Sequence, residues 1–536
     1  MFETGKKTTH LVFGHEARQR LYEGLDIAAK CVASTMGPSG RCVIIQQAGA
    51  TPIVTKDGVT VSRSINLKEP AQKMGAELIR EAASRTNDLA GDGTTTATVL
   101  THSMVKSGLR LLDAGYDTAD LKRGIERGTA AVIGKLLSDA TPVTTNDEVA
   151  QVGTISANGD VSIGALIAEA MSRVGRDGVI TVEDAKGMAT SMDVVDGMQF
   201  QRGYLTPYFV TNQEKMHAHY DDALVLVTDR KLSVLKELVP ILEAVKRSGR
   251  GLLIIADEVE QEVMQGLVLN RIHGALPVVA IKAPGFGHTK SAVLEDIAIM
   301  AGAKFFSVQT GLKLETVSLA DLGKLKRVTV DAKTSTLVGH GNTKTEIEAR
   351  CVELREQLTD VTLTAEEAEI LRMRIAKLSA GVAVIKVGGS TELEMVERKH
   401  RVEDALNATR AAVEEGIVPG GGMSLLNAST VLDSLQWDSE GERCGLDIVR
   451  KACFSPFEQI LANAGVSAEV VKMKLHEASS LPGVQHRGFN AATGEYVNMI
   501  ATGIIDPVKV ERVALENASS VAITFLSLDA LVVDDE

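Results

Sequence analysis

The middle third of the chain has a regular rhythm that restricts the folds open to it. Short apolar runs at residues 223–227, 252–256, 277–281 and 304–308 alternate with segments long enough to form a helix. Alternation of this kind is typical of βα units. The sequence therefore predicts an α/β domain in the centre of the chain.

The two ends of the chain are predicted to be mainly helical. Residues 74–88 and 96–112 carry apolar side chains at helical spacing, with few strand-like runs between them. Nearer the centre, Thr364 and Glu367 form a capping-box pattern ahead of an apolar stripe, which predicts a helix that begins directly after Thr364.

The length of the chain indicates several domains. With 536 residues it is too long for one core, and a prior of roughly 150 residues per domain suggests three or four units. An α/β centre between helical ends suggests an inserted domain. Gly197, Gly381 and Gly416 near the junctions are candidate hinges, although single glycines more often serve turns or close packing.

Charge and composition argue against several classes of protein. Acidic residues outnumber basic ones, 70 against 57, and the net charge of -13 disfavours nucleic acid as a partner. An apolar content of 44% is too high for a disordered chain. No apolar run approaches the roughly 18 residues that cross a bilayer, and the first residues resemble no secretory signal, so no membrane contact is expected. Five scattered cysteines without a CxxC pair argue against a disulfide framework or a zinc site and favour a reducing, cytoplasmic location.

Two central segments predicted as helices are more apolar than one buried face requires. In residues 232–247, Val239 lies off the main apolar stripe, and in residues 258–273, Met264 and Val268 lie beside theirs. Surplus apolar surface marks either a binding site or a second packing contact. The residues alone favour packing.

Three glycine-punctuated polar loops are the candidates for binding an anion. Neither GxxxxGK[ST] nor GxGxxG occurs in the sequence. In residues 90–96, two glycines flank Asp92 and three threonines open a predicted helix, so that N–H groups and hydroxyls suit phosphate and Asp92 suits magnesium. The same residues also suit an ordinary N-capping turn, which this segment by itself favours. The loops at 35–41 and 55–59 are weaker signals.

Two further features lie later in the chain. Gly420-Gly421-Gly422 follows Pro419 and forms either a turn on which a flat ring can pack or a flexible linker. Asp404 lies in the predicted helix 402–415. It could orient a water molecule, but the commoner role of such a residue is that of an exposed helix charge.

Together these segments resemble the motifs of group I chaperonins, the GroEL-type family. The nucleotide motifs are residues 35–40, Lys56-Asp57-Gly58-Val59, residues 91–100 and Gly420-Gly421-Gly422. Other similar segments are residues 151–158, 203–209, 282–287, 401–406 and 490–496. The likeness runs in order from Val12 to Leu526.

The resemblance implies the chaperonin fold, a multidomain α and α/β subunit. It consists of a mainly helical equatorial domain (1–138 and 415–536), a small intermediate domain (139–195 and 383–414) and an α/β apical domain (196–382). Gly197 and Gly381 then fall at the apical hinges, where Ala380 stands at a position at which the family tends to have another glycine.

The resemblance also implies an ATPase. Asp404 and Asp57 would position the attacking water, Asp92 would bind Mg²⁺, and K⁺ is a further cation that the family commonly uses. The residues implied to hold ATP are Thr35, Met36, Gly37, Pro38, Lys56, Asp92, Gly93, Thr94, Thr95, Thr96, Gly421, Asn490, Ala492 and Asp506. Phosphoryl transfer needs charge neutralisation and an in-line water more than covalent chemistry, and this set is suited to both.

Non-native polypeptides and a GroES-type co-chaperonin are the implied partners, bound by seven-subunit rings. The residues implied to bind them are Tyr204, Tyr208, Phe209, Val239, Leu242, Met264, Val268 and Leu269. This interpretation turns the surplus apolar surface of the central helices into a binding surface. The alternative is a specialised paralogue that holds clients or scaffolds partners with little ATP turnover.

The sequence departs from the family pattern in two places. Its last residues are Leu531-Val532-Val533-Asp534-Asp535-Glu536 in place of Gly-Gly-Met repeats. Glu458 and Ser467 stand where the family has an arginine–glutamate pair between two rings, although Arg110 and Glu440 offer a second contact. We therefore expect weaker association of rings, including a stable single ring.

Overall fold

The chain folds into two compact units. The computed structural model describes residues 9–46, 52–157, 159–175, 178–185, 187–213, 216–274, 276–285, 289–311, 313–358, 364–479 and 487–534. Unit 1 comprises Met1–Ala168 and Thr391–Glu536, and unit 2 comprises Glu169–Ser390. The centre of the chain is thus a separate body inserted between two ends that fold together, whereas the division into three domains stays a prediction.

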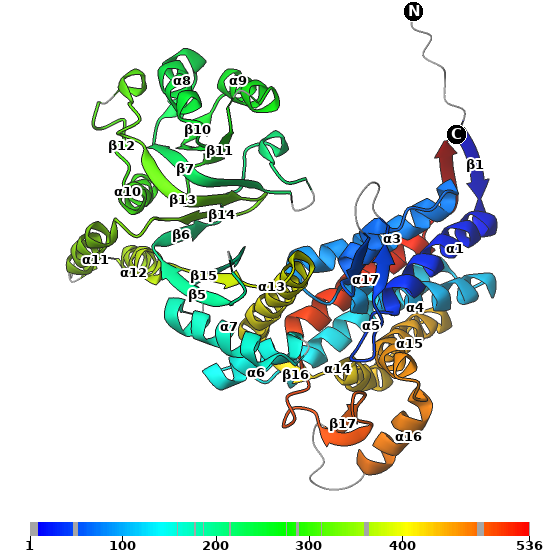
Figure 1. Ribbon diagram of the computed structural model, residues 1–536. Helices are drawn as coiled ribbons and strands as arrows, with labels where there is room; N and C mark the ends of the chain where they lie inside the picture. Colours follow the sequence, from blue (N-terminus) through cyan, green and yellow to red (C-terminus); the bar gives the residue numbers. More distant parts are fainter. Residues whose placement is uncertain are drawn as a thin grey trace, which may run out of the picture. The chain divides into compact units, whose positions relative to one another are not determined.

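Unit 1 is mainly helical, and both ends of the chain build its core (Figure 1). Its helices are α1 (Gly14–Ala33), α2 (Gly58–Ser64), α3 (Pro70–Ala90), α4 (Thr94–Asp113), α5 (Thr118–Asp139), α6 (Asn146–Ser156), the start of α7 (Val161–Val174), α13 (Glu392–Glu415), α14 (Met423–Ala428), α15 (Glu440–Asn463), α16 (Ala468–Ser479) and α17 (Val508–Leu526). The helices predicted at 74–88 and 96–112 are confirmed as α3 and α4. The C-terminal α17 packs on both of them, and its Phe525 is fully buried in the shared core.

Unit 1 also contains short antiparallel strand pairs. They are β1 (Thr9–Phe13) with β20 (Ala530–Asp534), β2 (Val43–Ile45) with β3 (Ile53–Thr55), β16 (Ile417–Pro419) with β19 (Ile505–Pro507), and β17 (Arg487–Asn490) with β18 (Glu495–Asn498). Of these, β1 with β20 and β16 with β19 join segments far apart in the sequence. In the third pair, Val418 lies opposite Asp506. This register brings the glycine turn that follows Pro419 to the side chain of Asp506.

Unit 2 contains the α/β domain that the sequence predicts. Its seven-stranded sheet has the order β11 (Val278–Lys282), β9 (Leu252–Ala256), β7 (Ala218–Thr228), β13 (Gly323–Val330), β14 (Ser335–Val338) and β6 (Gly197–Phe200), with β12 (Phe305–Phe306) paired to β7. The four predicted apolar runs are all strands, and β11, β9, β7 and β12 are parallel. A second sheet consists of β4 (Val179–Asp184), β15 (Val382–Val387) and β5 (Ser191–Val195).

The helices of unit 2 are α8 (Val239–Ser248), α9 (Gln261–Ile272), α10 (Thr289–Ala301), α11 (Lys344–Leu358) and α12 (Ala365–Ala380). The capping box at the start of α12 is confirmed: Thr364 N donates to Glu367 Oε2 (2.9 Å), and Glu367 N donates to Thr364 Oγ1 (3.2 Å). Within the described residues, no helix of either unit is long and apolar enough to cross a membrane.

The expected bounds of two central helices are wrong. The helix predicted over 232–247 begins at Val239, after the short strand β8 (Lys231–Leu232) and a 3-10 turn (Leu235–Glu237). Pro240 lies in the first turn of α8, where a missing N–H costs nothing, so it marks a helix start that the apolar stripe concealed. The helix predicted over 258–273 begins at Gln261, because Glu258–Val259 forms the strand β10, which pairs with β8.

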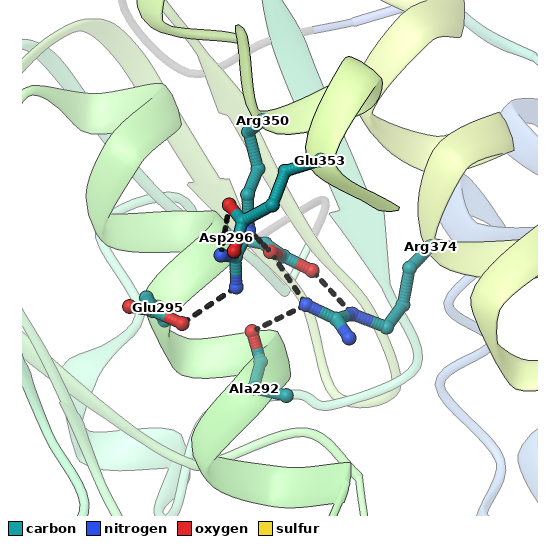
Figure 2. A network of polar contacts seen from close by, with 6 residues as sticks. All are labelled: Ala292, Glu295, Asp296, Arg350, Glu353 and Arg374. Atoms are coloured by element: carbon teal, nitrogen blue, oxygen red, sulfur yellow. Dashed lines mark hydrogen bonds and ion pairs between the residues drawn. The ribbon is translucent and has the colours of Figure 1, made fainter. Parts of the chain in front are cut away.

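A buried ionic network joins three helices of unit 2 (Figure 2). Asp296 of α10 is only 2% exposed, and Arg374 of α12 donates to both of its oxygens (2.7 and 2.9 Å). Arg350 of α11 donates to Asp296 Oδ1 (3.0 Å) and also binds Glu353 (2.8 Å). A buried carboxylate is stable only when it is paired in this way, so Asp296 fixes α11 and α12 against α10.

Two of the candidate hinge glycines end helices. Gly381 follows α12 with φ +66°, and Gly416 follows α13 with φ +86°. Both conformations favour glycine. Gly381 and Gly416 thus have the turn role that the sequence offered as the alternative to a hinge.

Candidate functional site

The loop between α3 and α4 is at the centre of the candidate site in unit 1. Gly91 ends α3 with φ +74°, and Gly93 precedes α4 with φ +82°. A Cβ atom on Gly91 would lie 2.5 Å from Cβ of Asn407, and one on Gly93 would lie 2.5 Å from Cγ1 of Val510. The two glycines therefore let Asp92 lie tightly between α13 and α17.

The start of α4 is not closed by a capping side chain. Asp92 Oδ1 accepts a hydrogen bond from the adjacent Gly93 N (2.6 Å), and no side chain among the described residues caps this helix. The Asp-Gly bend of the capping-turn alternative is present at Gly93, but it provides no side-chain cap. Thr94, Thr95 and Thr96 form the first turn, where backbone N–H groups and the helix dipole favour an anion.

The start of α2 lies against the start of α4. A Cβ atom on Gly58 would lie 2.7 Å from Thr94 Oγ1 and 2.6 Å from Thr95 Oγ1. Asp57 caps α2 by accepting hydrogen bonds from Val59 N (3.2 Å) and Thr60 N (2.9 Å). Lys56, the residue before it, is exposed.

The loop after α1 is held by a residue that the motifs did not include. Thr35 and Met36 are buried, whereas Gly37 and Pro38 are exposed. Nδ2 of Asn463, at the end of α15, donates to the carbonyl oxygen of Met36 (2.9 Å). In the sequence, the only feature that could have indicated a role for Asn463 is its polar side chain at the end of a long helical segment.

Three carboxyl groups from separate segments act on one another. Burial raises the pKa of Asp404 well above its ordinary value, and the nearby charges of Asp92 and Asp57 raise it further. Burial and the charge of Asp57 likewise raise the pKa of Asp92, against the opposing hydrogen bond from Gly93. The structure thus brings together Asp404 of α13, Asp57 and Asp92, and a cation among them would relieve their repulsion.

The carboxyl groups do not form a complete metal site. Across the described ranges, no three His, Cys, Asp or Glu side chains are arranged to hold a metal ion. A cation bound by Asp92 would therefore need other ligands, such as phosphate oxygens and water, which is the usual coordination of Mg²⁺ at nucleotide sites.

The triple-glycine segment is a tight turn and not a flexible linker. Gly421 and Gly422 have φ +67° and +76°, and a Cβ atom on Gly422 would lie 2.6 Å from Phe457 N. Gly421 N donates to Asp506 Oδ2 (3.1 Å). The structure therefore holds Asp506 against the glycine turn.

Asn490 shapes the neighbouring hairpin. Its Oδ1 accepts hydrogen bonds from Ala492 N (2.9 Å) and Thr493 N (3.4 Å), and Ala492 is exposed. The hairpin of β17 and β18 packs with Met423 of α14 and Phe457 of α15 in one apolar cluster. This packing attaches Asn490 and Ala492 to the elements that carry the glycine turn.

A further acid, Glu511, lies beside Asp506 and was missed by the sequence motifs. Burial raises the pKa of Asp506 to about 6, and the charge of Asp92 adds to this shift, whereas hydrogen bonds from Glu511 and Gly421 oppose it. Burial also raises the pKa of Glu511, well above its ordinary value.

The predicted apolar surface of unit 2 is only partly present. Tyr208, Leu269 and Val239 are exposed by 67%, 55% and 39%. The predicted residues Tyr204, Met264 and Val268 are partly buried against the core. The prediction is wrong for Phe209 and Leu242, which are 0% and 8% exposed because they pack into the core of unit 2.

Comparisons with known proteins identify the family and the fold. The sequence model of the TCP-1/cpn60 chaperonin family matches residues 28–536. Among solved structures, the chain is similar to the chaperonin gp146 from the bacteriophage EL 2 (Pseudomonas aeruginosa) in the presence of ATP-BeFx. Crystal form II gives a TM-score of 0.68 at 24% identity, over 98% of this chain and 99% of that chain. Crystal form I gives 0.63 at the same identity and coverage.

Proposed function

Because the chain belongs to the TCP-1/cpn60 chaperonin family, we propose that it is the subunit of an ATP-hydrolysing chaperonin that binds non-native polypeptides. The observation that carries this proposal is the meeting of Asp57, Asp92 and Asp404 beside the uncapped start of α4. Three clustered carboxyl groups next to an anion-binding helix start suit a nucleotide that arrives with its cation.

The residues of this site divide between two tasks. Asp92 would hold Mg²⁺, and the first turn of α4, with Thr94, Thr95 and Thr96, would bind the phosphates. When bound, Mg²⁺ supplies positive charge that neutralises the phosphate oxygens. Asp404 and Asp57 would remain as acceptors that orient the attacking water for in-line displacement.

Contacts within unit 1 hold Asp404 in position. Asn407, one turn after Asp404 in α13, donates through Nδ2 to Gly91 O (3.5 Å). At the end of the same helix, Glu415 receives hydrogen bonds from Arg512 of α17 (2.6 and 3.0 Å). These contacts link the helix that carries Asp404 to the loop and helix that surround Asp92, so a shift of α13 would change the distance from Asp404 to the phosphates.

The adenosine end of the nucleotide is assigned to a wall of the site formed by the glycine turn and Asp506. Gly421 offers a flat backbone surface to the base, and Asp506 offers a carboxylate to the ribose hydroxyls. Asn490 and Ala492 would complete this wall from the hairpin of β17 and β18. The phage chaperonin of the same fold was solved with ATP-BeFx, which supports nucleotide binding here by analogy.

Client binding is assigned to the exposed apolar side chains of unit 2. Tyr208, Val239 and Leu269 present apolar atoms to solvent, and the flexible side chain of Met264 lies partly buried on α9. Such a surface suits unfolded chains, which expose apolar groups without a common sequence. Assembly into seven-subunit rings and binding of a GroES-type co-chaperonin are part of this proposal.

The proposal is tested with the unmodified protein. We expect magnesium-dependent ATP hydrolysis and an ATP-dependent recovery of a chemically denatured, aggregation-prone enzyme, measured with and without a co-chaperonin. Binding of the denatured enzyme without ATP turnover would favour a holding or scaffold protein. Native mass measurement with and without ATP gives the number of subunits and rings.

A further inference from the structure

Glu511 is a buried acid beside the site for which neither the motifs nor the hydrolysis step gives a role. It lies in the first turn of α17 and is only 4% exposed. Its Oε2 atom is shielded from solvent and has no N–H or O–H partner among the residues that the structure describes. An ionised carboxylate in such a position is strongly unfavourable. Glu511 must therefore either carry a proton or accept a hydrogen bond from another acid.

Asp506 is the group that satisfies Glu511. The two side chains form a hydrogen bond. Two carboxyl groups can share a hydrogen bond only if one of them carries the proton, since ionised carboxylates only accept. Burial and the charges of Asp506 and Asp92 raise the pKa of Glu511, and the shared hydrogen bond favours its protonated form. Glu511 is therefore the donor, and Asp506 is the acceptor.

The hydrogen bond acts on a side chain that is already aimed at the glycine turn. Oδ2 of Asp506 accepts a hydrogen bond from Gly421 N (3.1 Å), and Oδ1 lies 3.1 Å from the position that a Cβ atom on Gly420 would occupy. Asp506 thus has a backbone donor on the turn side and an acid donor on the side of α17. Two donors fix the orientation of a carboxylate better than one and favour its ionised form.

The charged groups that shift the pKa of Glu511 are both acidic. The groups that act on it are Asp506 of β19 and Asp92 of the loop between α3 and α4. On α15, burial and the charge of Glu511 raise the pKa of the Cys453 thiol to about 12. The thiol is therefore neutral at physiological pH, and Glu511 gains no counter-charge from it.

We propose that Glu511 is a positioning residue of the nucleotide site: as a neutral acid it donates a hydrogen bond to Asp506, which keeps Asp506 ionised and oriented to accept a ribose hydroxyl. This inference rests on the proposed function, because it assumes that the nucleotide lies against Asp506 and Gly421. Glu511 acts at the adenosine end, whereas Asp404 and Asp57 are assigned to the phosphates. It therefore sets nucleotide affinity and leaves the hydrolysis step unchanged.

The test compares two replacements that differ in hydrogen bonding but not greatly in volume. Glu511→Gln keeps a donor for Asp506, whereas Glu511→Met removes it. We expect the Gln variant to keep the KM for ATP and the Kd for ADP within about twofold of the parent, and the Met variant to raise both by about tenfold, since a hydrogen bond to a charged group is lost. The kcat of both stays within about twofold of the parent, because the groups at the phosphates are untouched.

A buried glutamate elsewhere in unit 1 provides the control. Glu442 of α15 is 2% exposed, forms an ion pair with Arg127 and accepts a hydrogen bond from Asp438 N (2.9 Å). Glu442→Met loses a buried acid without touching the site, so its KM stays at the parent value even if its melting temperature falls. If Glu511→Met does not fold, Glu511→Leu takes its place in the comparison.

The outcomes separate this inference from the function on which it rests. Parent-like KM and Kd values in the folded Met or Leu variant would overturn it, as would a Gln variant that loses affinity as strongly as the Met variant. A parent protein that fails to bind ATP would instead overturn the proposed function, and with it this inference, before any variant is compared.

Discussion

The two units carry their functional residues in opposite environments. In unit 1, Asp92, Asp404 and Glu511 are polar groups in a place where burial raises their pKa values. In unit 2, Tyr208 and Leu269 are apolar groups left in water. Both arrangements are unfavourable without a ligand. A buried charge is stable only beside a counter-charge, and an exposed apolar surface is stabilised when another molecule binds to it. A cation with phosphate suits the first, and a non-native chain suits the second.

The largest expected effect concerns the tight loop of unit 1. Replacing Gly93 by Ala would place a Cβ atom 2.5 Å from Val510 Cγ1 at φ +82°, so the loop that carries Asp92 must move. We expect ATP binding to fall by at least about 100-fold, since misplacement by about 1 Å at such a site has effects of that order. Isothermal titration with MgATP measures it.

A second glycine separates the clash from backbone strain. Gly115, after the end of α4, has φ +90°, and a Cβ atom on it would meet no other part of the described chain within 4 Å. Gly115→Ala therefore introduces the backbone strain of a positive φ without a steric clash, and it should lower the stability by about 1 kcal/mol. If it weakens ATP binding as much as Gly93→Ala does, close packing at Gly93 is not the cause.

The adjacent residues Tyr208 and Phe209 allow an exposed and a buried aromatic side chain of unit 2 to be compared. Phe209→Ala empties a fully buried position and should destabilise unit 2 by about 3–5 kcal/mol. Tyr208→Ser removes an exposed ring and should leave the melting temperature nearly unchanged while it weakens capture of a denatured enzyme several-fold. Thermal unfolding and a client-capture assay distinguish the two. Equal effects of both variants on stability would contradict the assignment of Tyr208 to a binding surface.

The ionic network of unit 2 provides a stability change remote from the proposed chemistry. Asp296→Asn leaves Arg350 and Arg374 without their shared buried counter-charge and should cost about 3 kcal/mol. Hydrogen exchange should rise in α11 and α12, while the ATP affinity of unit 1 stays at the parent value. Unaltered exchange in both helices would show that Asp296 does not hold them.

A pH dependence of ATP binding is also expected in unit 1. The pKa of Asp506 is raised to about 6, so this group is ionised at pH 7.5 and becomes protonated as the pH falls below 6. Its ionised form is the better acceptor for ribose hydroxyls, and ATP affinity should therefore fall by about tenfold between pH 7.5 and pH 5. An Asp506→Asn variant should lose this step, and titrations at constant ionic strength check both. A step that persists in the variant belongs to another group.

The sequence predicted the elements of the fold well, because their periodicity is local. The strands of unit 2 and the helices α3 and α4 follow the spacing of apolar residues. The start of α8 was missed because an apolar stripe continues through a β-strand and a 3-10 turn, and only Pro240 marks the boundary.

The candidate site was predicted in part, and the omissions have a physical cause. Asp57 and Asp92 lie in recognisable loops, and Asp506 was indicated only by the resemblance to the family. Asn463 acts through a contact with a distant segment, and Glu511 acts on Asp506 of the preceding strand β19 only because both are buried there, which no local pattern records. The burial of Phe209 next to the exposed Tyr208 depends on how a 3-10 turn packs on the core of unit 2. Motifs indicate which residues are near a ligand, but packing decides which of them face it.

The central claim is that Asp404 promotes hydrolysis at a nucleotide site formed with Asp92 and Asp57, and single-turnover hydrolysis of bound ATP tests it most directly. Asp404→Ala should bind MgATP within about threefold of the parent and hydrolyse it about 100-fold more slowly, since it loses the group that orients water. Glu397→Ala, an exposed change on the same helix that removes only the ion pair with Arg401, should match the parent in both measurements. Parent-like hydrolysis by the Asp404→Ala protein would contradict the account.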